Sequence, residues 1–497
     1  MVRDGAVPGR GPSAEQHPVT GPEPGPVAPV LPWLLSGRSA AALSDQARRL
    51  ADFVSAHPEL DPLDLSWSLA VTGQALEHRA GVIGSDRQGL LTALEALATG
   101  KARAGTVTGT GGTGGRLGFV FTGQGAQRIG MGQGLYRAYP AFAEAFDAVC
   151  AALDEHLDQP VATVIRGESA DDGAGAGAAV LDDTQWAQAA LFAVEVALFR
   201  LLGSWGLHPD AVAGHSIGEL AAAHVAGVWS LPDAATVVAA RGRLMQALPR
   251  GGAMVAVATS EPAALAVLER HPGAAIAAVN GPQAVVLSGD EDAVSAAAAE
   301  LAAAGARTHR LRVSHAFHSP LMEPMLAQFA QVAASLSYRA PRIAMASSLT
   351  GRLVSDEVTE PGYWVRHLRE PVRFADAANA LRTAGVRTFA EIGPDGVLST
   401  MGPQTRTAQE TRTAQETQTA PQTRPAPQDG DELWLPALRR GRDEPRTLLT
   451  TVTRLHTRGA PVEWAAVLPT GRQIELPTAD PAGPQEETAE GRQGCRQ

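Results

Sequence analysis

Short apolar segments alternate with helical patterns along residues 117–402, and this alternation constrains the fold more than any other feature of the chain. The segments LGFVFTG (117–123) and AVAGH (211–215) have the length and composition of buried strands, and helical patterns cover 184–204 and 233–248. Strands that alternate with helices form a largely parallel sheet with helices on both of its faces. We therefore predict an α/β fold for this region.

The rhythm changes within this region, along residues 253–313. There the patterns run strand, helix, strand, strand, helix, strand, in the segments MVAVA, 261–270, AAIAAV, AVVLSG, 291–304 and THRLRV. This βαββαβ order is that of the ferredoxin-like split unit. We predict that residues 253–313 form a small ferredoxin-like subdomain, inserted into a large subdomain made of residues 116–252 and 314–402.

The remaining segments differ from this region in composition. Residues 31–115 contain two amphipathic helical patterns and form a small α/β unit that ends in a predicted flexible spacer, TGTGGTGG at 108–115. Residues 432–480 hold a further helical pattern near 444–457 and are too few to fold alone, so we expect them to pack back on the rest. Three polar or Pro/Gly-rich stretches are predicted to be disordered: 1–30, 403–431, in which the hexad TRTAQE occurs twice, and 481–497.

Composition narrows the partners and the compartment. The net charge of the 497 residues is −11 and no dense Lys/Arg cluster occurs, which argues against nucleic acid or an anionic membrane as the main partner. The two cysteines, Cys150 and Cys495, form no CxxC and cannot supply a disulfide framework or a tetrahedral metal site, so no metal is expected. We expect no signal sequence and no apolar run of the roughly 20 residues that span a bilayer. A soluble, cytoplasmic protein is therefore expected.

Ser216 stands in the segment GHSIG (214–218), between a predicted strand and a predicted helix. This is the context of a nucleophile elbow, in which a tight turn lifts a serine hydroxyl out at a helix N-terminus and glycines relieve crowding. A second reading is open. Ser216 could be a helix N-cap, with Glu219 three residues later completing a capping box.

A serine nucleophile needs a base, and the segment SHAFHSPLMEPM (314–325) offers His315 and His318. A neutral histidine can take up a hydroxyl proton and later return it to a leaving group. A histidine with no other support is more often a surface or core-edge residue. The pattern by itself therefore leaves both residues as candidates.

Arg241 lies in the middle of an apolar helical stripe, whereas Arg243 falls off it. The stripe consists of Val237, Val238, Leu244, Met245 and Leu248. A guanidinium on an apolar face is destabilising unless it meets an anion. That anion could be a buried Asp or Glu, or the side chain could extend to water. Alternatively, the guanidinium is held ready for a substrate carboxylate, both of whose oxygens arginine can bind.

The segment FVFTGQGAQRIGMG (119–132) is a strand that runs into a Gly-rich turn. It lacks the Gly-Lys-Ser/Thr ending of a phosphate-binding P-loop. A turn of this kind brings backbone N–H groups close to a reacting atom. Together with the N–H of the residue after Ser216, it could form an oxyanion hole.

Six motifs of this chain occur in the order, and with roughly the spacing, found in the acyltransferase domains of modular type I polyketide synthases and in the malonyl-CoA:acyl carrier protein transacylases. They are FTGQGAQ, GHSIGE, RGRLMQ, AVNGPQAVVLSG, HAFHSPLMEP and FAEIGPDGVL. The resemblance spans about 117–402 and implies an α/β-hydrolase-like large subdomain with the small one inserted. The segments 32–101 and 432–478 resemble the ketosynthase-to-acyltransferase linker and the post-acyltransferase linker of those synthases, which pack together.

This resemblance implies a role for each matching residue. Ser216 would be the nucleophile, His318 its base, and Arg241 the ligand of the free carboxylate of an extender unit. Gln124 and Ile217 would offer backbone N–H groups to the oxyanion.

Further site residues follow from the same resemblance. Gln188 would line the pocket; the family usually has proline or a small residue next to it, and Ala189 stands there. Asn280 would support the site from the small subdomain. No acidic third member is expected, because the histidine would be oriented by a backbone carbonyl near Arg373.

The implied activity is transfer of a malonyl group from malonyl-CoA to Ser216 and then to the phosphopantetheine thiol of an acyl carrier protein. Coenzyme A and phosphopantetheine belong to substrate and partner, and no bound cofactor is expected. In the family, HAFH, GHSIG and a TxxAQ stretch, here at 184–188, accompany malonyl. Phe317 is large enough to fill the space of an α-methyl group. Because one methyl group is worth only about 1 to 3 kcal/mol in such a pocket, some leakage to methylmalonyl is expected.

The chain shows neither the reactive-cysteine motif of a ketosynthase nor the serine motif of a carrier domain. We therefore expect it to meet its carrier protein in trans, or to be one piece of a divided synthase. Two other functions stay open. One is an editing hydrolase that discharges the same acyl-serine to water, and the other is a catalytically idle docking module.

Overall fold

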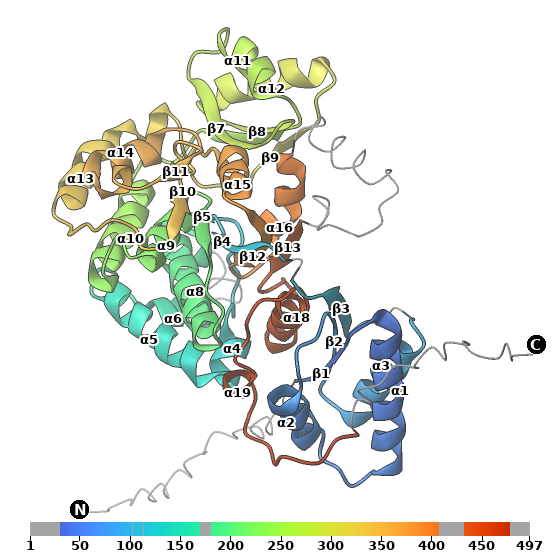
Figure 1. The fold of residues 1–497 in the computed structure, drawn as a ribbon. Helices are drawn as coiled ribbons and strands as arrows, with labels where there is room; N and C mark the ends of the chain where they lie inside the picture. Colours follow the sequence, from blue (N-terminus) through green and yellow to red (C-terminus); the bar gives the residue numbers. More distant parts are fainter. Residues whose placement is uncertain (1–29, 102, 113, 169–179, 407–431, 478–497) are drawn as a thin grey trace, which may run out of the picture.

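The computed structural model describes residues 30–101, 103–112, 114–168, 180–406 and 432–477. Within them the chain forms three sheets, each with its own helices (Figure 1). Of the stretches predicted to be disordered, only Val30 and residues 403–406 fall within the described residues. There Gly402–Thr405 form a 3₁₀ turn, so this end of the predicted linker is ordered.

The largest sheet has six strands in the order β11-β10-β5-β4-β12-β13. Its strands are β4 (Arg116–Phe121), β5 (Ala211–Gly214), β10 (Ala344–Ala346), β11 (Leu353–Val354), β12 (Val386–Ile392) and β13 (Leu433–Pro436). All neighbours pair in parallel except β10 and β11, which are antiparallel. This result confirms the largely parallel sheet predicted from the alternation of strands and helices.

Helices flank this sheet (Figure 1). They are α4 (Gln133–Ala138), α5 (Pro140–Asp154), α6 (Val161–Arg166), α8 (Thr184–Ser204), α9 (Ile217–Ala226), α10 (Leu231–Gln246), α13 (Glu323–Ala334), α14 (Pro361–Arg369), α15 (Phe374–Thr383) and α16 (Val397–Met401). Helices α9 and α15 both lie against β5. The sheet and its helices share one apolar core, in which Phe119 of β4 and Val212 of β5 are fully buried.

Helix α8 lies against α5, α9 and α10. By length and composition alone it could cross a membrane, so the expectation that no apolar run reaches roughly 20 residues is wrong. The fold accounts for its apolar character, because 78% of its most apolar window is buried inside the protein. Burial of this kind is typical of a core helix.

The second sheet belongs to the small subdomain. Its elements are β6 (Ala253–Val257), α11 (Glu261–Leu268), β7 (Ala274–Gly281), β8 (Ala284–Gly289), α12 (Glu291–Ala303) and β9 (Thr308–Arg310). The strand order β7-β8-β6-β9 with antiparallel pairs is ferredoxin-like, which confirms the predicted βαββαβ unit. Strand β7 also pairs at Ala278 with Val372 of the large subdomain, so hydrogen bonds join the two subdomains.

The third sheet belongs to the N-terminal unit and has the order β1-β2-β3. The elements are β1 (Leu31–Gly37), α1 (Ala40–Ala56), α2 (Pro62–Thr72), β2 (His78–Gly84), α3 (Arg87–Ala98) and β3 (Thr106–Thr110). The flexible spacer predicted at TGTGGTGG is partly wrong, because Thr108, Gly109 and Thr110 pair with β2. A Cβ atom on Gly109 would lie 2.8 Å from Thr457 Oγ1. This glycine therefore allows a helix to cover the strand closely.

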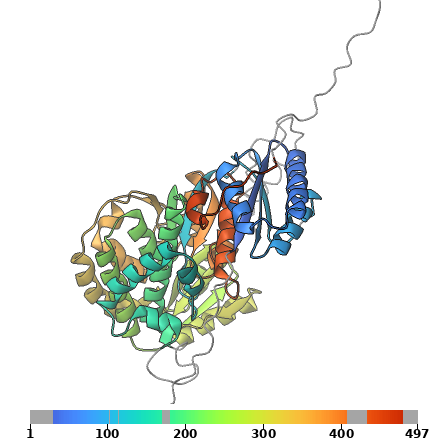
Figure 2. The same ribbon diagram turned by 90° about the horizontal axis from the view of Figure 1, so that it is seen from below.

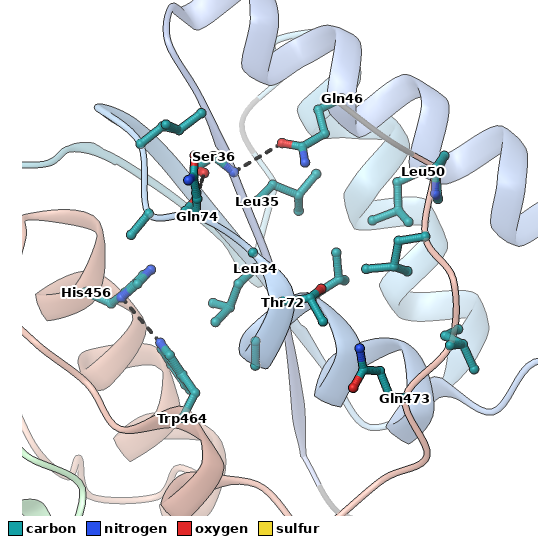
Figure 3. Close-up of a pocket in the computed structure, with 18 of the residues that line it drawn as sticks. Leu34, Leu35, Ser36, Gln46, Leu50, Thr72, Gln74, His456, Trp464 and Gln473 are labelled. Atoms are coloured by element: carbon teal, nitrogen blue, oxygen red, sulfur yellow. Dashed lines mark hydrogen bonds between the residues drawn. The ribbon is translucent and has the colours of Figure 1, made fainter. Parts of the chain in front are cut away.

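The C-terminal segment joins the other units. Strand β13 is an edge of the largest sheet, α18 (Glu444–Thr457) lies against β2, β3 and α4, and α19 (Trp464–Val467) lies against α2. Figure 2 shows α18 between the N-terminal unit and the large subdomain. Beside α19 is a pocket of about 480 Å³, where Trp464 Nε1 donates a hydrogen bond to His456 Nδ1 at 3.3 Å (Figure 3).

Candidate active site

Ser216 lies in the turn between β5 and α9. Its backbone has φ 53° and ψ −113°, and among the described non-glycine residues only Ser216 and His318 have a positive φ. Strain of this kind is found where a functional side chain is held in a fixed position. The flanking glycines are required by close approach. A Cβ atom on Gly214 would lie 2.1 Å from the carbonyl carbon of Gly218, and one on Gly218 would lie 2.3 Å from Phe121 O.

The capping-box reading of this turn is wrong. Ser216 is the N-cap of α9, but its side chain makes no capping hydrogen bond. The carboxylate of Glu219 also turns away from the helix N-terminus and accepts hydrogen bonds from Ser348 and Tyr363. The serine hydroxyl is therefore free for other partners.

Ser216 Oγ lies 2.8 Å from His318 Nε2, although the two residues are 102 positions apart in the chain. The other ring nitrogen, His318 Nδ1, donates a hydrogen bond to the backbone carbonyl of Glu370 at 2.9 Å. A proton on Nδ1 leaves Nε2 as the acceptor for the serine hydroxyl. The backbone carbonyl expected near Arg373 is thus that of Glu370, three positions before it. The Arg373 side chain forms an ion pair with Glu261 at 2.8 Å.

His318 is almost fully buried, and this burial controls its protonation. Burial lowers the pKa of the imidazole well below its usual value, and the charges of Arg241 and His367 act in the same direction. The imidazole is therefore neutral near neutral pH, which is the state that can accept a proton.

His315, the other candidate base, has different partners. Its Nε2 lies 3.0 Å from Leu248 O, and its Nδ1 lies 2.9 Å from Ser314 Oγ. Both ring nitrogens are therefore used to hold the segment that precedes His318, and neither contacts Ser216. Of the two candidates, His318 is the one in contact with the serine hydroxyl.

Arg241 reaches Ser216 from α10. It is 2% exposed, and its Nη2 donates a hydrogen bond to Ser216 Oγ at 3.1 Å. In the described part of the chain its Nε has no hydrogen-bond partner. Burial lowers the pKa of Arg241 to about 9, and the charge of Glu219 opposes this shift. The guanidinium is therefore cationic at neutral pH and has donors available to an anion beside the serine.

The Gly-rich turn after β4 lies against the elbow. A Cβ atom on Gly123 would lie 2.8 Å from His215 Nδ1, so the two turns are in close contact. Gln124 follows in this turn and lines the same cavity as Ser216. Ile217 is buried and is the first residue of α9. Two backbone turns thus meet beside the serine, as an oxyanion hole requires.

The site opens into a cavity of about 830 Å³ that both subdomains line. Gln188, on α8, donates a hydrogen bond to Met245 Sδ at 3.3 Å. Asn280 Oδ1, on β7, lies 3.0 Å from His215 Nε2 and so connects the small subdomain to the elbow. The predicted site residues that line the cavity are Gln124, Gln188, Ser216, Arg241, Asn280, Phe317 and His318. Among the described residues, no group of three or more His, Cys, Asp or Glu side chains could hold a metal ion.

Sequence reasoning placed one group beside this site only approximately and misinterpreted another. Glu370 contributes a backbone carbonyl, which leaves no mark on a pattern of side chains. Glu219 did give a signal, since an acidic residue directly follows GHSIG, but its nearest explanation in the sequence was a helix cap.

An α/β sheet with an inserted ferredoxin-like unit, and a serine at the end of a strand in contact with a histidine, fit the acyltransferase class of protein. The chain belongs to the acyl transferase domain family, because the sequence model of that family matches residues 118–462. Residues 33–94 match a second family, described as CurL-like, PKS C-terminal.

Its curated relatives include very long polyketide synthases. Polyketide synthase GfsA of Streptomyces halstedii is 48% identical over 457 residues, which cover 91% of this chain and 6% of that protein. The phenolphthiocerol synthesis polyketide synthase type I Pks15/1 of Mycobacterium marinum is also 48% identical over 457 residues, or 91% of this chain and 20% of that protein. The chain therefore spans only a small part of the length of these relatives.

Solved structures agree with this family. The acyltransferase domain from the second module of the salinomycin polyketide synthase is 49% identical, with a TM-score of 0.69, and the match covers 87% of this chain and 95% of that one. The malonyl CoA-acyl carrier protein transacylase (FabD) from Coxiella burnetii is 27% identical, with a TM-score of 0.57. This match covers 68% of the present chain and 98% of the FabD chain. The α/β fold predicted for this chain is thus the fold of its family.

Proposed function

We propose that the chain transfers a malonyl group from malonyl-CoA to Ser216, and from there to the phosphopantetheine thiol of an acyl carrier protein in polyketide biosynthesis. The hydrogen bond of 3.1 Å between Arg241 Nη2 and Ser216 Oγ supports this most directly. In a malonyl ester a single carbon separates the carboxylate from the ester carbonyl, so a cation that binds this carboxylate must lie close to the serine oxygen. Arg241 meets this requirement and can bind both carboxylate oxygens.

In the first half-reaction, Ser216 Oγ attacks the thioester carbonyl carbon while its proton passes to His318 Nε2. Negative charge develops on the carbonyl oxygen, where the backbone N–H groups of Gln124 and Ile217 would stabilise it. The carbon–sulfur bond then breaks, and coenzyme A leaves with the proton that His318 held. The product is a malonyl ester of Ser216.

In the second half-reaction, the carrier thiol gives its proton to His318 and attacks the ester carbonyl. The carbon–oxygen bond breaks, and Ser216 Oγ regains the proton. Because coenzyme A leaves before the carrier reacts, the kinetics are ping-pong. Arg241 would hold the malonyl carboxylate in both steps, which fixes the ester in an orientation that favours the thiol over water.

The rim of the cavity suits phosphorylated substrates. Arg250, Arg312 and Arg440 line it and are exposed, although the chain as a whole carries a net charge of −11. Arg250 and Arg440 also pair with Asp183 and Asp395, at 3.7 and 3.5 Å. These exposed cations would attract the phosphates of coenzyme A and of the phosphopantetheine arm, in competition with the two aspartates. A carrier protein met in trans, in the cytoplasm, belongs to the same proposal. The structural neighbour FabD from Coxiella burnetii, a malonyl CoA-acyl carrier protein transacylase, supports both this donor and this acceptor.

Selectivity for malonyl would rest in part on Phe317, which lines the cavity and is 8% exposed. Its ring would occupy the space that an α-methyl group needs. One methyl group is worth about 1 to 3 kcal/mol in a pocket of this kind, so methylmalonyl would be disfavoured without being fully excluded.

The test is intact-mass measurement after incubation with a mixture of malonyl-, methylmalonyl- and acetyl-CoA. The expected result is a single malonyl adduct on the wild type and none on Ser216→Ala, followed by loss of the adduct when a phosphopantetheinylated carrier protein is added. A wild type that stays unmodified would overturn the proposal in favour of a docking module. Release of free malonate faster than transfer to the carrier would favour the editing hydrolase.

A further inference from the structure

Glu219 is the last residue of the GHSIGE motif, and the proposed mechanism gives it no part. Its side chain is fully buried, three positions after Ser216 on α9. A buried carboxylate is stable only where hydrogen bonds or opposite charges replace its hydration. The groups that do this for Glu219 come from parts of the chain that also reach the candidate catalytic histidine.

Two segments supply the partners of Glu219. From α14, the Tyr363 hydroxyl donates to Glu219 Oε1, and His367 Nε2 lies 3.2 Å from Glu219 Oε2. The geometry of the His367 contact is not that of a hydrogen bond. From the turn after β10, Ser348 donates its backbone N–H to Oε2 at 2.9 Å and donates its hydroxyl to the same oxygen.

Both segments lead to the carbonyl that orients the histidine. Glu370 is the C-cap of α14, and its carbonyl accepts the hydrogen bond from His318 Nδ1. Ser348 O accepts a hydrogen bond from Arg373 N at 2.5 Å, which holds the residues that follow Glu370. Glu219 is thus joined by two short routes to the support of His318, and by one turn of α9 to the nucleophile.

The electrostatics of the cluster agree with this arrangement. Burial by itself would raise the pKa of Glu219, but the nearby His367 together with the hydrogen bonds from Ser348 and Tyr363 outweighs burial and lowers the pKa. Burial also raises the pKa of Tyr363 well above its usual value, so the hydroxyl keeps the proton that it donates. Glu219 is therefore ionised, with its donors in place.

We propose that Glu219 is a positioning residue for the Ser216–His318 pair, whose carboxylate joins the helix that carries the nucleophile to the helix end that orients the base. A shift of about 1 Å in such a pair can lower a rate by about 100-fold, so a link of this kind bears directly on reactivity. The inference rests on the proposed function only in taking Ser216 as the reactive hydroxyl.

The test uses the full chain and a fluorophosphonate probe. Its phosphorus forms a bond to an activated serine oxygen and loses fluoride, and no acyl-CoA is needed. Intact mass gives the limiting rate and the apparent affinity of labelling, with Ser216→Ala as the blank. Glu219→Gln should lower the limiting rate by about 10- to 100-fold and leave the affinity unchanged. Tyr363→Phe should also lower the rate. The double variant should be slowed by less than the product of the single effects, because both changes remove one link.

Glu432→Gln is the matched control. Glu432 is also a buried carboxylate, it pairs with Arg382 and Arg406 at 2.7 and 2.9 Å, and it stands just before β13. The thermal unfolding midpoint of the Glu432→Gln variant should fall, while the rate at which the probe labels its Ser216 stays at the wild-type value. If the labelling rate of Glu432→Gln falls together with its stability, the loss of rate in Glu219→Gln is a general effect of destabilising the fold. That result would overturn the proposal.

Two further outcomes would also overturn the proposal. In the first, Glu219→Gln and Tyr363→Phe fold and are labelled at the wild-type rate. In the second, the loss of rate in the double variant equals the product of the two single losses. Should Glu219→Gln fail to fold, Ser348→Ala replaces it in the same cycle with the same criteria. A wild type that reacts with the probe but takes no malonyl group would refute the proposed function and leave this inference to be decided by the cycle.

Discussion

The guanidinium of Arg241 donates a hydrogen bond to the hydroxyl of Ser216 at 3.1 Å, on the same oxygen that lies 2.8 Å from His318 Nε2. The cation that would bind a carboxylate and the base that would accept a proton therefore act on a single atom. The choice of acyl group and the reactivity of the serine are coupled through this oxygen. They can be separated by changing one partner at a time.

Removal of the Arg241 side chain should change the preferred acyl group. A charge-assisted hydrogen bond contributes about 1.5 to 3 kcal/mol, so Arg241→Ala should slow loading of malonyl by about 10- to 150-fold while loading of acetyl is kept or improved. Competition between malonyl-CoA and acetyl-CoA, read by intact mass, measures this ratio. Arg243→Ala is the control, because Arg243 stands two positions on in the same helix and is exposed. An unchanged ratio in Arg241→Ala would remove this residue from the site.

Labelling of Ser216 should continue to unusually low pH. The lowered pKa of His318 keeps the imidazole neutral below its usual value of 6.5, and only the neutral form accepts the serine proton, so the acid limb of the profile should lie below pH 6.5. In Arg241→Gln a neighbouring positive charge is lost, the pKa of His318 should rise, and the acid limb should move to higher pH. Fluorophosphonate labelling rates from about pH 4.5 to about pH 8.5, an interval of about two units on either side of the usual histidine value, measure both profiles. A wild-type limb at or above 6.5 contradicts the assignment of His318 as the base.

Truncation of Phe317 should weaken discrimination against a methyl branch. Phe317→Ala opens space in the cavity wall, so the preference for malonyl over methylmalonyl should fall by up to about 10- to 200-fold. The ratio of the two adducts after exposure to an equal mixture of the CoA esters reports it. Leu321→Ala, a truncation of an exposed side chain in the same HAFHSPLMEP segment, should keep the wild-type ratio. If both variants discriminate alike, the methyl group is excluded by another part of the wall.

Gly218 should tolerate no side chain. A Cβ atom there would lie 2.3 Å from Phe121 O and 2.6 Å from Thr122 O, both of them backbone atoms that cannot move without shifting the Gly-rich turn. Gly218→Ala should destabilise the fold by about 1 to 3 kcal/mol and slow labelling of Ser216. Denaturant unfolding of this variant is compared with that of Gly362→Ala, where nothing lies within 4 Å of the added atom. Equal midpoints for the two variants would show that the turn is not tightly packed.

Many elements of this fold could be predicted, because each of them is determined by residues that lie close together in the sequence. The helix predicted near 444–457 is Glu444–Thr457 in the structure, and the βαββαβ unit has its elements in the predicted order. The elbow at Ser216 needed only a strand, a turn and a helix in succession. Each of these features is encoded by residue patterns within a short window.

The wrong interpretations share one cause, which is a partner far away in the chain. Glu219 was interpreted as part of a cap, but its donors Ser348 and Tyr363 lie 129 and 144 positions further on. The TGTGGTGG spacer was interpreted as flexible, but Gly109 is small because Thr457 of α18 packs on it. A local pattern cannot distinguish a glycine needed for freedom from one needed for close approach.

By itself the sequence determined which side chains could carry the chemistry and the kind of element in which each one stands: a serine at an elbow, an arginine on an apolar stripe, two histidines in one segment. Only the tertiary structure decided which of them meet, namely that His318 and not His315 reaches Ser216, and that the donors of Arg241 converge on the same oxygen. The physical reason is one of range. A hydrogen bond acts over about 3 Å, whereas Ser216 and His318 are 102 positions apart, so their distance is set by how β5, α9 and α14 pack together.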